Sequence, residues 1–353
     1  MGRKNMNNDS TKLIIGIITY GKTTARYLPY FLASLEEQTF KNFKIIVIDN
    51  TENVIDSPVT HDQDEYMALD GRVTRINENI EYIENNYSSD ETKGKLDIEI
   101  EVNNKNVGFA RAYNQIIKKA WDEEAKYLLV INPDIILDSD AIEKMINALG
   151  NNEDLGSVSP KVLKWDFARN AKTKVIDTCG IKLMSGLRFF DTGQNEEDNG
   201  QYDDTKIIGP SGAAGMYRLE ALEKIKKDGE YFDEQMFMYK EDCDMAYRLA
   251  LQGFKSKCIS EAKVFHDRTT SSWGEGDFKV AMNRKNKSRQ VKKWSFLNQL
   301  IINTKYWGLQ NFKSKLAILR HEFKMIIFAI IFEQYLLEQL VEFLKIRNNI
   351  KRY

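Results

Sequence analysis

The chain has 353 residues, 42% of them hydrophobic and 29% charged, which excludes a disordered or fibrous protein and predicts a soluble globular one with one large or two ordinary domains. Its three cysteines are far apart and show no C-x-x-C spacing, which argues against disulfides and zinc sites and favours a reducing cytoplasm; the polar first residues predict no signal peptide. The formal net charge is −1, yet residues 273–353 hold 16 Lys or Arg against 6 Asp or Glu, a surplus that favours an anionic partner, either a membrane surface or nucleic acid.

The first half of the chain alternates strand and helix patterns. Apolar, β-branched runs at Leu13–Thr19 and Phe43–Asp49 flank a helical pattern over 24–38, which predicts a β-α-β unit. The expected elements that follow are a strand over 96–102, a helix near 107–123, a strand over 127–131 and a helix near 139–149. This alternation predicts an α/β sheet with its ligand crevice beyond the carboxyl ends of the strands. Residues 51–95 are acidic and weakly periodic, which is typical of a long insertion or a mobile loop.

The second half begins with short strand patterns and ends in helices. The expected elements are strands over 157–163, 175–183 and 206–208, helices near 218–226 and over 241–251, a closing pair of strands at 255–259 and 262–265, and helices beyond 273. The last helices include the eight apolar residues 325–332, too few to cross a bilayer, which needs about 20. They predict a helix that lies at a membrane surface or packs on the body.

The stretch 236–248 carries the most chemistry. It places Glu241, Asp242 and Asp244 between an aromatic run and a helix. One carboxylate is enough to cap a helix, so we expect another of them to face a partly apolar cleft and to act as a general base. An acidic cap alone is the other interpretation of this segment.

Two strand ends carry further polar groups. Asp134, in the sequence Asn132-Pro133-Asp134, follows a buried strand, where a carboxylate suits a divalent cation bound to phosphates. Asp49 closes another strand and could accept hydrogen bonds from a nucleobase or ribose. A Pro-Asp helix cap and a plain strand-end turn are the alternatives.

A helix start and a lone histidine complete the candidates. Asn106, Gly108 and Arg111 lie at the beginning of a predicted helix, where N–H groups and an arginine can bind phosphate; an ordinary Asn cap is the alternative. His266 follows a strand and could bind a metal or phosphate, or be structural. The chain has no G-x-G-x-x-G after its first strand, no P-loop and no G-x-S-x-G elbow.

Taken in order, these segments resemble family 2 glycosyltransferases over about 13–290. The nucleotide half is carried by 17–20, 47–50, 106–110 and 132–134, and the acceptor half by 212–214, 232–234, 239–244 and His266. The N-P-D variant and 177–180 resemble the rhamnosyltransferase-like branch. The resemblance implies a GT-A fold, an α/β nucleotide-binding sheet flanked by helices, with a C-terminal helical extension. It divides the chain into a transferase domain at 1–272, with halves 1–135 and 136–272, and a basic helical extension at 273–353.

The resemblance also assigns roles. It implies inverting transfer of a sugar from a nucleotide diphosphate to a hydroxyl. The implied residues are Asp242 as base with Glu241 as its competitor, Asp134 and His266 at Mg²⁺ or Mn²⁺, and Thr19, Tyr20, Asp49, Asn106, Gly108, Arg111 and Asn132 around the nucleotide sugar. Asn132 stands where many relatives have aspartate, and Gly21 where asparagine is common.

The sequence therefore predicts a transferase that uses a nucleotide diphosphate sugar, with dTDP-rhamnose as the first candidate. We expect a glycan or lipid-linked glycan acceptor in cell-surface polysaccharide synthesis, at the inner face of the cell membrane, and no nucleic acid partner. The basic tail would contact the membrane; packing on the body or a homodimer interface is the alternative. The rival functions are a sugar-phosphate nucleotidyltransferase and a non-catalytic, nucleotide-sugar-binding assembly subunit.

Overall fold

A mixed ten-stranded sheet forms the centre of the computed structural model, which describes residues 12–52, 77–87, 96–203, 205–268 and 288–353 and the backbone of two short strands. Its strand order is β12-β14-β8-β13-β6-β1-β2-β5, with β7 paired to β14 and β9 to β8. The strands are β1 (Leu13–Thr19), β2 (Phe43–Asp49), β5 (Ile98–Val102), β6 (Tyr127–Ile131), β7 (Ile135–Leu137), β8 (Leu155–Asp166), β9 (Ala171–Thr178), β12 (Lys206–Ile207), β13 (Ala214–Arg218) and β14 (Lys255–His266). β1, β2, β5 and β6 run parallel, and β13 returns antiparallel to β6.

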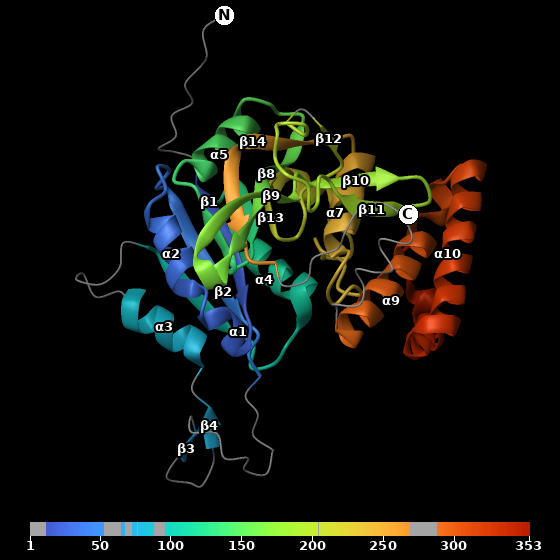
Figure 1. Ribbon diagram of the computed structural model, residues 1–353, viewed down its shortest axis with the longest axis horizontal. Coiled ribbons are helices and arrows are strands. Elements are labelled where there is room, and N and C mark those ends of the chain that lie inside the picture. Colours follow the sequence, from blue (N-terminus) through green and yellow to red (C-terminus); the bar gives the residue numbers. More distant parts are fainter. Residues whose placement is uncertain are drawn as a thin grey trace, which may run out of the picture.

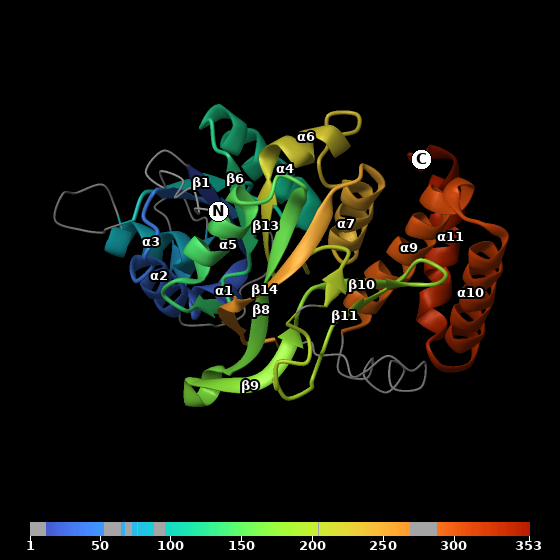
Figure 2. The same cartoon turned by 90° about the horizontal axis from the view of Figure 1, so that it is seen from above.

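Helices cover both faces of this sheet, and the alternation of side chains along the strands explains why (Figures 1 and 2). Leu13, Ile15 and Ile17 point to a core shared with α2 (Leu28–Glu36) and α5 (Ala141–Gly150). Ile14 points to the opposite core, which is built with α4 (Gly108–Asp122), α6 (Leu219–Ile225) and α7 (Glu241–Leu251). The central strands β1 and β6 are therefore almost wholly apolar, as in α/β sheets that are buried on both sides.

Four expected elements differ from the structure. The strand predicted over 175–183 is broken at Cys179-Gly180 into the end of β9 and β10 (Ile181–Met184), which belong to different sheets. The helix predicted over 24–38 is split into α1 (Gly21–Ala25) and α2, because Pro29 in the first turn of α2 lacks an N–H and would clash with an earlier turn. The predicted pair of closing strands is the single strand β14, with an irregularity between Ile259 and Lys263. The stretch 51–95 contains α3 (Glu78–Tyr87), which buries Ile83, and a pair β3 (Glu65–Met67) and β4 (Val73–Arg75), so the prediction of a loop was wrong there.

The C-terminal segment is helical, as predicted. It contains α9 (Arg289–Tyr306), α10 (Phe312–Phe332) and α11 (Glu338–Ile346), which gather at one side of the molecule with α10 outermost (Figures 1 and 2). α9 buries Ile301 and Tyr306 against Met236 and Cys243 of the body. In the described part of the chain, no helix combines the length and the apolar character that a bilayer crossing requires. The expected domain boundary at 272 falls within 269–287, outside the described residues.

Candidate active site

Strand pairing brings Asp134 and His266 together. β6 ends at Ile131, the N-P-D turn follows, and β7 then runs antiparallel to the end of β14, with Ile135 opposite His266. The N–H of Asp267 donates to the carbonyl of Asp134 at 3.0 Å, which fixes the turn against the strand end. As a result, His266 Nε2 lies 3.2 Å from Asp134 Oδ1.

A second layer of charged groups orients the histidine. Nδ1 of His266 lies 2.8 Å from Oδ2 of the fully buried Asp177, at the end of β9. Arg268 lies 3.1 Å from Asp177 and 3.1 Å from Asp191, which ends the hairpin formed by β10 (Ile181–Met184) and β11 (Arg188–Asp191). Burial opposes the charge on His266, but Asp134 and Asp177 outweigh it and raise the pKa of His266 to about 10. Burial acts to raise the pKa of Asp177, but the positive charges of Arg268 and His266 outweigh it and lower that pKa.

The residues at this point fit a divalent cation only in part. Asp134 Oδ1 is buried, and among the described residues its polar neighbour is Nε2 of His266, the imidazole nitrogen that does not face Asp177. A carboxylate behind a ligating histidine is the usual outer-shell arrangement of a metal site. The described residues contain no cluster of three or more His, Cys, Asp or Glu side chains suited to a metal. An ion here would therefore need oxygen ligands from a bound diphosphate or from water.

The two carboxylates at the start of α7 have different environments. Asp242 is half-buried, and its Oδ2 accepts from the N–H of Gly212 at 2.8 Å while Oδ1 accepts from the N–H of Cys243 at 2.7 Å. Glu241 is buried, and its Oε2 has no hydrogen-bond partner among the described residues. Burial first, and then the negative charge of Asp242, raises the pKa of Glu241 well above its usual range. Burial thus favours the neutral form of Glu241, which makes the half-buried Asp242 the better candidate for a proton acceptor.

Asp242 and Asp134 are linked through adjoining backbone at one edge of the sheet. β6 and β13 are antiparallel neighbours, so the end of one lies beside the beginning of the other. The N–H of Asn132 donates to the carbonyl of Ala213 at 2.9 Å, and the preceding residue, Gly212, binds Asp242. The charge of Asp242 also adds to the effect of burial in raising the pKa of Asp191, whose partner Arg268 binds Asp177. Backbone hydrogen bonds therefore connect the segment of the predicted metal-binding pair with the segment that holds the predicted base.

The nucleotide end of the predicted site is organised around Asp49. This carboxylate is fully buried at the end of β2. Its oxygens accept hydrogen bonds from Thr19 Oγ1 at 2.6 Å, Thr51 N at 3.0 Å, Asn77 Nδ2 at 2.7 Å and Asn79 Nδ2 at 3.5 Å. Thr19 is fully buried as well, whereas Tyr20 is 43% exposed. Asp49 thus joins two strand ends to α3, and Tyr20 is the member of this group with most free surface.

The start of α4 is packed against the acceptor half. Gly108 has a φ of +83°, and a Cβ built on it would lie 2.5 Å from the carbonyl oxygen of Phe237, so only glycine fits. The N–H of Gly108 donates to Asn106 Oδ1 at 3.0 Å and that of Phe109 to the carbonyl of Phe237 at 2.8 Å. Arg111 pairs with Glu234 at 2.8 Å. The N–H groups and the arginine predicted to bind phosphate therefore have protein partners here.

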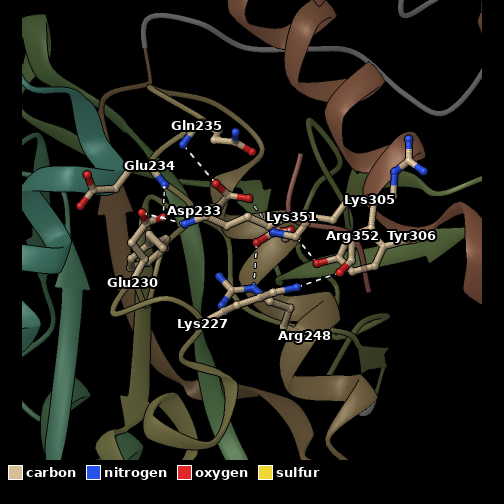
Figure 3. Close-up of polar contacts among 12 residues, drawn as sticks. Lys227, Glu230, Asp233, Glu234, Gln235, Arg248, Lys305, Tyr306, Lys351 and Arg352 are labelled. Atoms are coloured by element: carbon tan, nitrogen blue, oxygen red, sulfur yellow. Dashed lines mark hydrogen bonds and ion pairs between the residues drawn. The ribbon is translucent and has the colours of Figure 1, made fainter. Parts of the chain in front are cut away.

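The third carboxylate of the acidic cluster serves a different purpose. Asp244 is fully buried and pairs with Arg248 at 2.8 Å, Lys305 at 2.7 Å and the hydroxyl of Tyr306 at 2.6 Å. Lys305, which belongs to α9, also lies 2.7 Å from Asp233 (Figure 3). Burial opposes the charge on Asp244, but Lys305 and Arg248 lower its pKa to about 2. Asp244 therefore joins α7 to the C-terminal helices.

α9 also holds the loop that leads to Asp242. The side-chain amide of Asn298 donates to the carbonyls of Met238 at 2.9 Å and Tyr239 at 2.6 Å. The ring of Trp294 packs on those of Phe237 and Tyr239, with centroid distances of 5.1 and 6.4 Å. Tyr239 adopts a positive φ of 71°, a conformation that costs a non-glycine residue energy and needs such support.

Several residues of the site were not among those predicted from the sequence: Asp177, Asp191, Arg268, Gly212, Asn77, Asn79 and Lys305. Asp177 ends a strand, a signal that could have indicated it. The others lie in irregular segments or far along the chain, where no local pattern indicates their partners.

Solved structures share this architecture at low sequence identity. GalNAc-T7, solved with UDP, GalNAc and Mn²⁺, has 11% identity and a TM-score of 0.53, with 84% of this chain and 49% of that chain covered. This likeness and the observed sheet support the predicted GT-A type of α/β fold. Mannosyltransferase PcManGT from Pyrobaculum calidifontis, in complex with GDP-Man and Mn²⁺, has 13% identity and a TM-score of 0.49, with 94% of this chain and 73% of that chain covered. TarS from S. aureus has 15% identity and a TM-score of 0.47. The similarity covers 89% of this chain but only 43% of the TarS chain, so this chain spans less than half the length of TarS.

No curated protein sequence matches this chain. The sequence profile described as "Glycosyl transferase family 2" matches residues 14–226, which is more than half of the chain. The match includes Asp49 and Asp134 and ends before Asp242 and His266. On this match, the chain belongs to glycosyl transferase family 2.

Proposed function

We propose that the chain transfers a sugar from a nucleotide diphosphate donor to an acceptor hydroxyl with inversion, and that Asp242 is the general base. The observation that carries this proposal is the backbone link between Asp134 and Asp242 through Asn132, Ala213 and Gly212. A single displacement needs a proton acceptor on one side of the sugar and a stabilised leaving group on the other.

Asp242 would take the proton of the acceptor hydroxyl as its oxygen attacks the anomeric carbon. The bond from that carbon to the diphosphate oxygen breaks, and the diphosphate leaves with the electron pair. The hydrogen bonds from Gly212 and Cys243 hold the carboxylate in place while it does so, at 2.8 and 2.7 Å. A general base of this kind accelerates a reaction by about 10²- to 10⁴-fold.

Mg²⁺ or Mn²⁺, when bound, would neutralise the charge of the leaving diphosphate, and Asp134 and His266 are the residues that would hold it. GalNAc-T7, which has a similar fold, was solved with UDP, GalNAc and Mn²⁺, and this supports a divalent ion here. Asp177 would keep the imidazole oriented, since it lies 2.8 Å from Nδ1.

The donor pocket is proposed at Thr19, Tyr20 and Asp49. Asp49 would act mainly by ordering the surrounding loop, because its oxygens already bind Thr19, Thr51 and Asn77. The remaining residues proposed near the nucleotide sugar are Asn106, Gly108, Arg111 and Asn132. Among donors, dTDP-rhamnose is the first to test, on the resemblance of 177–180 to the rhamnosyltransferase-like branch.

The acceptor is proposed to be a glycan or lipid-linked glycan at the inner face of the cell membrane. Residues 1–272 would form the transferase domain and 273–353 an extension that contacts the membrane. The position of α10 at the outer side of the molecule supports that role (Figures 1 and 2).

The experiment is a transfer assay with a panel of nucleotide sugars, with and without Mn²⁺, in which release of the nucleoside diphosphate and the anomeric configuration of the product are both measured. We expect one donor to react, with inversion and with dependence on the cation. Asp242→Asn should stop transfer while donor binding, followed by thermal shift, stays intact. Unchanged turnover by Asp242→Asn would reject the base assignment.

A further inference from the structure

α10 carries an apolar stripe on the face turned away from the molecule. The stripe is formed by large side chains spaced three or four apart, which places them on one side of a helix. Its members and their exposed fractions are Phe312 81%, Leu316 59%, Leu319 53%, Phe323 66%, Ile327 39% and Ile330 47%. The opposite side of the helix buries Ile318 and Ala329. A continuous exposed stripe of this length is typical of a surface that binds something.

A row of cations borders the stripe. Lys313, Arg320 and Lys324 are exposed, and their spacings of seven and four residues place them along one edge of the stripe, at about 100° per residue. The only acidic residue of α10, which is described in full, is Glu322. It lies on the inner side, where it accepts from Asn303 at 2.9 Å and where burial raises its pKa. The outer side of α10 thus presents apolar groups and positive charge with no carboxylate.

We propose that this stripe and its basic edge bind an anionic lipid surface, with the apolar side chains below the headgroups and the cations at the level of the phosphates. Basic amphipathic helices bind membranes in this orientation. A second copy of the chain fits less well, because it would bring two basic rows together with no carboxylate of α10 to offset them. The inference rests on the proposed function only in placing the acceptor at the same membrane.

The stripe is joined to the active site through few contacts. Asn303 of α9 donates to Glu322 of α10 at 2.9 Å. Gln299, also of α9, donates to the carbonyl of Leu187 in the β10–β11 hairpin at 3.0 Å. The same helix holds the loop before Asp242 through Asn298. A lipid surface against α10 would therefore lie one helix away from the loop that positions the base.

The test is co-sedimentation of the full chain with vesicles of phosphatidylcholine alone or with added phosphatidylglycerol. We expect pelleting with the anionic vesicles, weakened by salt, and little pelleting with the neutral ones. The double variant Leu319→Glu/Phe323→Glu should lower binding at least tenfold, and Lys313→Glu/Arg320→Glu by about fivefold or more per cation removed. Leu251→Glu and Lys257→Glu, which alter exposed residues of the body, are the matched controls and should bind as the unaltered chain does.

Each outcome is decisive. Absence of pelleting, or equal pelleting of the stripe variant and the unaltered chain, overturns the proposal. If light scattering shows that the unaltered chain is a dimer and that the stripe variant is a monomer, the surface would be assigned to a second copy of the chain instead. Sugar transfer to a water-soluble acceptor is measured on the same samples and should survive in all variants that keep their circular dichroism. A chain that binds anionic vesicles but transfers no sugar would remove the proposed function and leave the lipid surface standing.

Discussion

Lys305 of α9 lies 2.7 Å from Asp244 of α7, so the C-terminal helices share a buried ion pair with the helix that carries the proposed base. Lys305 pairs with Asp233 as well, and all three side chains are at most 3% exposed. The extension is therefore part of the same packed structure as the acceptor region, rather than a separate tail.

Removal of this cation should be costly. Lys305→Met leaves Asp233 and part of Asp244 buried without a counter-charge, and we expect a loss of about 3–5 kcal/mol in the free energy of unfolding, measured by urea titration. Lys345→Met is the control, because Lys345 is exposed and pairs only with Glu342 on the surface, a type of pair worth less than about 1 kcal/mol. Equal losses in the two variants would contradict the importance of the buried cluster.

The two neighbouring carboxylates of α7 should respond differently to neutralisation. Asp242→Asn should lower kcat by about 10²-fold or more, because it removes the proton acceptor. Glu241→Gln should keep most of the activity, because burial raises the pKa of Glu241 and so favours the neutral form that glutamine imitates. Steady-state kinetics on the two variants decides the assignment, and a greater loss for Glu241→Gln would reverse it.

Asn298 should act on the reaction without touching substrate. Asn298→Ala releases the carbonyls of Met238 and Tyr239, and we expect kcat to fall about tenfold or more through misplacement of Asp242. The donor KM should change little. Asn303→Ala is the matched control, because it removes the same kind of side-chain amide from the same helix, and that amide binds Glu322 rather than the loop before Asp242. Identical kinetics for the two variants would show that the loop needs no support from α9.

Asp177 should matter for the cation rather than for the nucleotide. Asp177→Asn alters the partner of His266 Nδ1, and we expect Mn²⁺ to bind about 10- to 100-fold more weakly in the presence of a nucleoside diphosphate, measured by calorimetry. Nucleoside diphosphate binding without the ion should be close to that of the unaltered chain. An unchanged Mn²⁺ affinity would contradict the proposed metal site.

Acid should weaken the fold through Asp244. Its pKa is about 2 in the folded chain and near 3.8 in the unfolded chain, so the unfolded chain takes up a proton first as the pH falls. The stabilisation is complete above pH 4 and is lost progressively as the pH falls toward 2. Urea midpoints between about pH 6 and pH 3 should show this decline, and Asp244→Asn should make it shallower. Parallel pH profiles would argue against this contribution.

The sequence was sufficient for the parallel strands β1, β2, β5 and β6 of the sheet. The apolar runs of β1, β2 and β6 are buried on both faces, and their polar ends indicate the edge at which Asp134 lies. It was not sufficient for partners that the sheet brings together from a distance, such as Asp177 with His266, which are 89 residues apart. The spacing of the acidic residues did not by itself separate Asp242 from Asp244, and that choice rested on the resemblance. The structure shows Asp244 turned inward, toward Lys305 of α9.

Gly108 has a consequence for how this chain could be altered. Its missing side chain lets the carbonyl of Phe237 approach the start of α4, so these two segments meet with no room for a Cβ between them. Swapping either segment for that of a relative will succeed only where the incoming backbone can come equally near. Recombination of this chain with its relatives is therefore limited at this point by the path of the backbone.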